Sequence, residues 1–88
     1  MNVVATSSFN KDISRIKEEK VVAQLEKIIR SLESIRSIRE LKSIKKMKGA
    51  TDAYRIRMGD YRIGFYLVEN TIKLTIVASR KDIYNRFP

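Results

Sequence analysis

The sequence predicts a single α+β domain, spanning residues 1–88, in which an antiparallel sheet packs on a hairpin of two helices. Three observations lead to this fold class. The chain opens with a short β-branched run, its first half has the apolar spacing of amphipathic helices, and its second half alternates apolar and polar residues between short turns. The predicted element order is β-α-α-β-β-β-α, and a chain of 88 residues builds one small core.

The first half of the chain predicts one strand and two helices. Residues 2–5 form a β-branched strand, which we expect at an edge of the sheet. Thr6, Ser7 or Ser8 caps a short helix that runs to about Lys17. A longer amphipathic helix follows, and we assign its apolar face to packing: Val21, Val22, Leu25, Ile28, Ile29, Leu32 and Ile35.

Residues 37–48 fit two descriptions. Their apolar residues are spaced by three, which indicates either helical turns or a packed loop: Ile38, Leu41, Ile44 and Met47. Gly49 ends the segment, and the same stretch carries four lysines between Lys42 and Lys48 without an acid.

The second half predicts a three-stranded meander that begins at Ala53. Gly59-Asp60 and Glu69-Asn70 are its two short turns. One face is apolar and must pack on the helices: Tyr54, Ile56, Met58, Tyr61, Ile63, Phe65, Leu67, Ile72, Leu74, Ile76 and Ala78. Residues 81–87 form a final helical turn.

The composition narrows the function. The formal net charge is +9, from 19 basic and 10 acidic residues, which favours a polyanionic partner over a surface that is basic by chance. The sequence has no histidine and no cysteine, so a Ser-His-Asp or Cys-His catalytic centre is excluded and we expect no metal and no cofactor. No apolar run approaches the roughly 20 residues of a membrane span, and the N-terminus lacks a signal-peptide pattern, so we expect a cytoplasmic protein without a membrane partner.

The polar face of the meander is the candidate functional surface. A two-residue turn at 59–60 places Arg57 opposite Arg62, and two arginines across a strand pair repel each other. It also places Arg55 opposite Gly64, and a glycine within a central strand often marks the close approach of a ligand. We therefore predict a shallow phosphate-binding site, with Tyr66 farther along as a stacking ring, although a solvated basic face is the simpler alternative.

Arg80 raises a problem that the strand pattern cannot solve. Simple alternation would send its guanidinium to the apolar face, where an unpaired charge is costly to bury. We therefore expect the chain to leave the sheet, or to bulge, near Ser79, so that Arg80 swings toward Arg62.

Four segments of the chain form a recognisable set: residues 9–12 (FNKD), 46–49 (KMKG), 54–63 (YRIRMGDYRI) and 76–84 (IVASRKDIY). Together they resemble the RelE/ParE toxin superfamily over nearly the whole chain. The resemblance implies a RelE-like fold and a toxin that is neutralised by an acidic antitoxin encoded beside it. In the RelE branch, which the arginines and Tyr84 favour, such a toxin is a metal-independent endoribonuclease that cuts messenger RNA on the ribosome.

The resemblance also implies roles for individual residues. The family's functional positions fall on Arg55, Arg57, Arg62, Arg80 and Tyr84. We assign catalysis to Arg62, Arg80 and Tyr84, and RNA binding to Arg55 and Arg57 together with Lys46, Lys48 and Lys81. Two departures matter. Arg55 and Arg57 stand where well-known RelE members have lysines, and an arginine is a poor general base. Ser79 stands where relatives often have a histidine, so a histidine-dependent mechanism cannot operate.

Two other functions fit the same sequence. A toxin of the ParE branch would poison DNA gyrase, and its induction would block supercoiling rather than translation. A catalytically inactive relative would bind nucleic acid within a repressor complex, and its overproduction without an antitoxin would be harmless.

Overall fold

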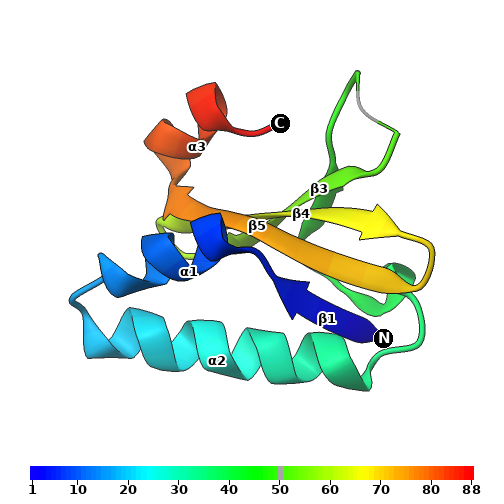
Figure 1. Ribbon diagram of the computed structural model, residues 1–88, viewed down its shortest axis with the longest axis horizontal. Coiled ribbons are helices and arrows are strands. Elements are labelled where there is room, and N and C mark those ends of the chain that lie inside the picture. Colours follow the sequence, from blue (N-terminus) through cyan, green and yellow to red (C-terminus); the bar gives the residue numbers. More distant parts are fainter. Residues whose placement is uncertain (50) are drawn as a thin grey trace.

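The computed structural model of the protein describes residues 1–49 and 51–88 and confirms an α+β fold. Helices α1 and α2 cover one face of a sheet, and α3 lies on the opposite face (Figure 1). The elements in chain order are β1 (Asn2–Ala5), α1 (Ser7–Ser14), α2 (Glu19–Ser34), the 3-10 turn η1 (Ile38–Glu40), β2 (Ile44–Lys46), β3 (Ala53–Met58), β4 (Tyr61–Val68), β5 (Thr71–Ser79) and α3 (Arg80–Arg86). No helix in the described ranges is both long and apolar enough to cross a membrane.

The sheet has five strands in the order β1-β5-β4-β3-β2. The meander β3-β4-β5 is antiparallel as predicted, and β1 lies at an edge as expected, but it pairs parallel with β5. Strand β2 was not predicted. It forms because residues 44–46 pair antiparallel with β3, with Ile44 opposite Ile56. The spacing of apolar residues within a segment does not show that it will pair with a strand farther along the chain.

Local capping fixes the ends of the helical segments. Thr6 is the N-cap of α1, since its Oγ1 accepts the backbone N–H of Phe9 at 3.1 Å. Helix α1 ends at Ser14, three residues before the predicted end. In η1, Ser37 and Glu40 form a capping box. The Glu40 carboxylate accepts hydrogen bonds from the backbone N–H groups of Arg36 and Ser37, and these bonds lower the pKa of Glu40.

The main core lies between the sheet and the helices α1 and α2. Phe9 of α1 and Leu25 and Leu32 of α2 are fully buried against apolar side chains of the strands, which are Ile56, Met58, Ile63, Phe65, Ile72, Leu74 and Val77. Tyr54 stacks on Phe65 with ring centroids 5.4 Å apart. This part of the predicted apolar face is confirmed.

The prediction that Ile76 and Ala78 share this face was wrong. Gly64 pairs with Ile76 and Phe65 with Leu74, so Thr75 is an extra residue in β5. Such a bulge inverts the alternation, and Val77 points to α1 and α2 instead. Ile76 and Ala78 join a second core beneath α3, together with Met47, Ala53, Ile83 and Phe87.

Candidate functional site

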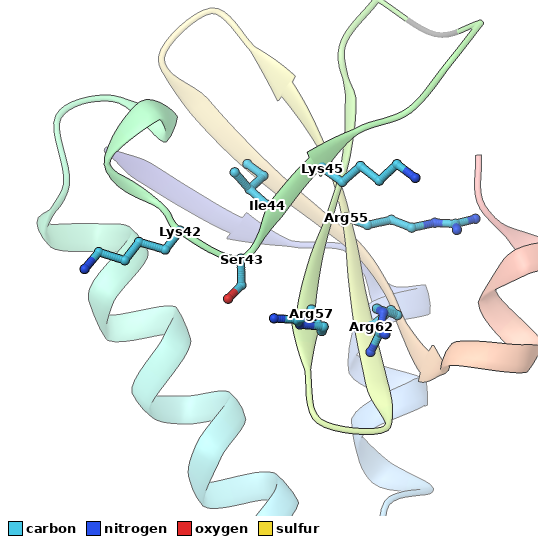
Figure 2. Close-up of a pocket in the computed structure, with 7 residues that line it drawn as sticks. All are labelled: Lys42, Ser43, Ile44, Lys45, Arg55, Arg57 and Arg62. Atoms are coloured by element: carbon cyan, nitrogen blue, oxygen red, sulfur yellow. The ribbon is translucent and has the colours of Figure 1, made fainter.

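A pocket of about 430 Å³ opens on the polar side of the meander. Three strands and the segment before β2 form its wall, with Lys42, Ser43, Ile44, Lys45, Arg55, Arg57 and Arg62 as lining residues (Figure 2). The described residues of this wall include five cations and no acid. The register pairs Arg57 with Arg62 and Arg55 with Gly64, as the turn at 59–60 predicted. The pocket therefore presents a concentrated positive potential to any ligand.

Arg62 lies at the centre of the cationic cluster. Its Nη1 donates to the carbonyl oxygens of Gly59 at 2.7 Å and Tyr61 at 2.8 Å, which fixes the guanidinium beside the turn. Partial burial lowers the pKa of Arg62, and the like charges of Arg80 and Arg57 lower it further. Both cations therefore lie close enough to Arg62 to disfavour its charged form.

The start of α3 brings Arg80 to this cluster. The chain leaves the sheet at Ser79, as expected, and Ser79 caps α3 by accepting the N–H of Asp82 at 3.2 Å. The backbone N–H of Arg80 donates to the carbonyl of Asp60 at 2.8 Å, which ties the first residue of α3 to the β3–β4 turn. Arg80 is thus held close enough to Arg62 to repel it.

Arg55 lines the pocket, but it has a second set of partners. Its Nη2 donates to the carbonyl of Ile83 at 3.1 Å and to the carbonyl of Phe87. Its Nε is buried without a hydrogen-bond partner among the described residues. The guanidinium predicted to bind RNA is therefore engaged at the C-terminal end of α3.

Gly64 and Tyr66 also serve packing. A Cβ on Gly64 would lie 2.6 Å from Cγ2 of Ile76 and 2.8 Å from the ring of Phe87. The space above this glycine is filled by the C-terminal segment of the chain, which corrects the expectation that a ligand approaches there. Tyr66 is half-buried and packs its ring against Phe87 with centroids 5.2 Å apart, so it is not the free stacking ring that we expected.

The lysines are distributed differently from the prediction. Lys45 pairs with Arg55 and lines the pocket, and so does Lys42, whose side chain points away from the arginines (Figure 2). Lys46 pairs with Tyr54 and lines a separate hollow beside η1, and Lys48 is exposed in the β2–β3 connection. The lysine run was visible in the sequence, but only the pairing of β2 with β3 decides which lysines face the pocket.

Helix α3 carries the remaining predicted residues. Lys81 is exposed, and the side chain of Tyr84 is 78% exposed although it is large and aromatic. Tyr84 follows Arg80 by four positions, so the two side chains are neighbours on one side of the helix. The described residues contain no group of three His, Cys, Asp or Glu side chains that could hold a metal ion.

The fold is that of a class of small proteins solved in toxin–antitoxin complexes. The structure matches the RelB–RelE antitoxin–toxin complex from Methanococcus jannaschii with a TM-score of 0.82 and 33% identity, covering 97% of this chain and 99% of that chain. It matches the RelE–RelB complex from Pyrococcus horikoshii OT3 with a TM-score of 0.73 and 23% identity, covering 90% and 93% of the two chains. YafQ from E. coli strain BL21(DE3) shares the fold at 7% identity, with a TM-score of 0.74 over 94% and 97% of the two chains.

Sequence similarity decides the family. The chain is 37% identical to toxin RelE3 of Methanocaldococcus jannaschii over 89 aligned positions, which cover all of both proteins. No family model matches the chain. With a curated relative at this identity over its full length, the protein belongs to the RelE toxin family.

Proposed function

We propose that this protein is a ribosome-dependent endoribonuclease that cleaves messenger RNA, as the toxin of a toxin–antitoxin pair. The observation that carries the proposal is that Arg57 and Arg62 line one pocket while Arg80 lies close enough to Arg62 to repel it. A sequence selected for folding alone would relieve that repulsion with a neutral or acidic residue. A bound phosphate would relieve it as well, because each guanidinium can donate to phosphate oxygens.

The reaction that fits this pocket needs no metal. The 2′-hydroxyl of one nucleotide attacks the adjacent phosphorus, the bond to the 5′-oxygen of the next nucleotide breaks, and a 2′,3′-cyclic phosphate remains. One proton leaves the 2′-hydroxyl and another joins the departing 5′-oxygen. In this proposal Arg62 and Arg80 stabilise the negative charge that builds up on the phosphate oxygens. Losing one such donor typically lowers the rate about 10²- to 10³-fold.

Tyr84 is the candidate for proton transfer or base stacking. Its ring is exposed on α3, four residues after Arg80, so it is accessible to a ligand in solution. Arg55 and Arg57 replace the lysines of well-known relatives and remain charged, so they are suited to electrostatic stabilisation rather than to accepting a proton. Positioning of the RNA by the ribosome would compensate for the absence of a strong base.

The RNA-binding surface that we propose extends beyond the predicted residues. Lys42 and Lys45 belong to it because both line the pocket. Lys46, Lys48 and Lys81 lie outside the pocket and would contact the flanking backbone of the RNA or the ribosome. Phosphate contacts of this kind raise affinity without selecting a sequence.

An acidic antitoxin is the protein partner that we propose. The solved relatives from Methanococcus jannaschii and Pyrococcus horikoshii OT3 are complexes of RelE with RelB. The net charge of +9 would speed the association of an acidic partner by electrostatic steering.

The proposal is tested by the variants Arg62→Ala and Arg80→Ala in a translating extract, with mapping of the messenger RNA ends. We expect cleavage to fall about 10²- to 10³-fold for each, while Arg30→Ala on the exposed surface of α2 keeps the wild-type rate. Undiminished cleavage by both pocket variants would remove these arginines from the mechanism. Intact messages together with blocked DNA supercoiling would instead place the protein with the gyrase poisons, and harmless overproduction would mark it as inactive.

A further inference from the structure

We propose that Arg55 and Asp12 are positioning residues that clamp α3 from its two sides and so hold Arg80 and Tyr84 at the pocket. Neither residue needs to touch RNA for this role. The clamp itself stands on contacts within the protein, whereas its effect on cleavage rests on the proposed function.

Helix α3 depends on such contacts because it is short. It has seven residues, and isolated helices of this length are not stable in water. Two apolar anchors, Ile83 and Phe87, hold its inner side against the second core. Apolar contacts alone tolerate sliding and rotation, whereas hydrogen bonds to fixed partners define a single orientation.

Arg55 supplies the first clamp, at the C-terminal end of α3. The last carbonyl groups of a helix have no partner within the helix, and a cation there also offsets the negative end of the helix dipole. Nη2 of Arg55 donates to the carbonyl of Phe87, the C-cap residue, and to the carbonyl of Ile83, which also accepts the N–H of Phe87. Since Arg55 is part of β3, which pairs with β2 on one side and β4 on the other, this contact ties α3 to an interior strand of the sheet.

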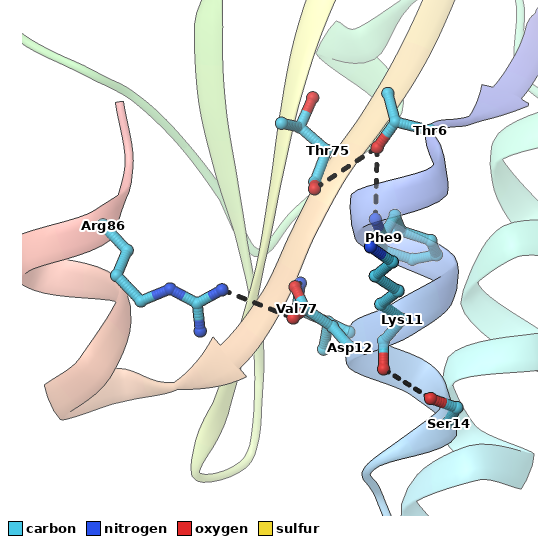
Figure 3. A network of polar contacts seen from close by, with 8 residues as sticks. All are labelled: Thr6, Phe9, Lys11, Asp12, Ser14, Thr75, Val77 and Arg86. Atoms are coloured by element: carbon cyan, nitrogen blue, oxygen red, sulfur yellow. Dashed lines mark hydrogen bonds and ion pairs between the residues drawn. The ribbon is translucent and has the colours of Figure 1, made fainter.

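Asp12 supplies the second clamp, across the edge of the sheet. It is the charged residue that is buried among the described residues, with a side chain only 6% exposed. Its Oδ2 accepts the backbone N–H of Val77 at 3.1 Å, and its Oδ1 lies 3.3 Å from Nη2 of Arg86 on α3 (Figure 3). Strand β1 ends opposite Leu74 and does not extend to Val77. One oxygen of the Asp12 carboxylate therefore accepts the Val77 N–H in place of a neighbouring strand, and the other oxygen contacts α3 on the opposite face of the sheet.

The two clamps act on the residues that we place in the reaction. Arg55 and Asp12 hold α3 near its end, at residues 83–87, and the Ser79 cap and the Arg80 N–H hold its start, so Tyr84 lies between fixed points. Loss of either clamp would let Tyr84 and the guanidinium of Arg80 shift by a fraction of a helical turn. A misplacement of about 1 Å can lower a rate roughly 10²-fold.

The arrangement also predicts that arginine and lysine are not equivalent at position 55. Lysine would preserve the positive charge of the pocket but has one nitrogen on a shorter side chain, in place of the planar group that now reaches both carbonyls. A residue that only attracts phosphate would tolerate this change, because a phosphate contact depends mainly on charge. A clamp would not tolerate it.

The test uses Arg55→Lys, Asp12→Asn, Arg86→Gln and the Asp12→Asn/Arg86→Gln double variant, with Arg30→Gln as the matched control. Arg86 is the safeguard against misfolding, since its side chain is 46% exposed and its removal leaves Asp12 bonded to Val77. Two quantities are measured at a temperature where every variant is folded. The first is the hydrogen exchange rate of the Phe87 N–H, which donates to the Ile83 carbonyl. The second is the single-turnover rate of cleavage, together with the ribosome concentration that gives half of the maximal rate.

We expect the Phe87 amide to exchange at least about 10-fold faster in each variant, with unchanged exchange in α2. Cleavage should fall about 10- to 100-fold at an unchanged half-saturating concentration. The double variant should be no worse than the poorer single variant, because both substitutions break one contact. Unaltered Phe87 exchange would overturn the clamp, and faster exchange with wild-type cleavage would overturn its positioning role. If the wild-type protein cleaves no messenger RNA, the proposed function is wrong, and so is the role of the clamp in positioning catalytic residues. The amide exchange measurement would still decide whether the clamp itself exists.

Discussion

Replacing Arg57 with threonine should make the protein more stable and less active at the same time. Arg57 lies directly opposite Arg62 in the β3–β4 pair, and its exposed side chain makes no hydrogen bond within the described part of the chain. Its backbone N–H bond to Ser43 is independent of the side chain. Arg57→Thr thus removes a repulsion, and threonine favours strands.

The size of the stability change follows from the register. A like-charge pair directly across two strands is unfavourable by roughly 0.2–1 kcal/mol. For a domain of 60–100 residues, about 1 kcal/mol shifts the unfolding midpoint by about 4–8 °C. The variant should therefore unfold about 1–8 °C higher than the wild type. The gain should shrink in high salt, because the Debye length falls from about 10 Å at 0.1 M to about 3 Å at 1 M.

The assay combines thermal unfolding, followed by circular dichroism at 0.05 M and 1 M salt, with cleavage of messenger RNA on ribosomes. Loss of one charge-assisted contact to phosphate is worth about 1.5–3 kcal/mol, so cleavage at limiting ribosome concentration should fall about 10- to 150-fold. Arg57→Lys is the matched control, since it keeps the repulsion and should gain no stability. A lower midpoint for Arg57→Thr, or an equal gain at both salt concentrations, would refute the view that repulsion at this site opposes folding.

Three further predictions test other parts of the structure. Lys45→Gln should weaken cleavage more than Lys46→Gln, because Lys45 lines the pocket and Lys46 does not. It should also reduce the salt dependence of RNA binding by about one counterion. Equal effects of the two substitutions in a filter-binding series would contradict this assignment. Gly64→Ala should destabilise the fold by roughly 1–3 kcal/mol in urea, because the new methyl group would clash with Ile76 and the ring of Phe87; an unchanged midpoint would show that this segment yields freely. Glu40→Gln should lower the unfolding midpoint at pH 7, because the pKa of Glu40 is lower in the folded protein than in the unfolded chain. The difference between variant and wild type should fade as the pH falls below the unfolded pKa of about 4.3 and then through the folded pKa. A difference that persists at pH 2 would exclude the charge of the cap as its cause.

Local interactions made much of the fold predictable from the sequence. Thr6 was predictable as a cap because its hydroxyl competes for backbone N–H groups three residues away. The register of the β3–β4 pair followed from the turn at 59–60, since a two-residue turn leaves one possible pairing, and Arg57 therefore faces Arg62. The repulsion between these two arginines could be inferred before any coordinate was known.

Long-range contacts explain what the sequence patterns missed. Strand β2 exists because it pairs with β3, and its apolar spacing alone resembled helical turns. The extra residue Thr75 turns Ile76 and Ala78 toward α3, and nothing in an alternating strand sequence marks where one residue is left unpaired.

The sequence by itself determined the order of the main elements, the basic character of the protein and the pairing that gathers arginines beside one turn, because caps, periodicity and short turns act over a few residues. Only the tertiary structure decided that Lys45 rather than Lys46 faces the pocket, that Phe87 fills the space above Gly64, and that Arg55 is bonded to α3. These outcomes depend on groups that meet from distant parts of the chain, where packing and hydrogen-bond geometry select the partners.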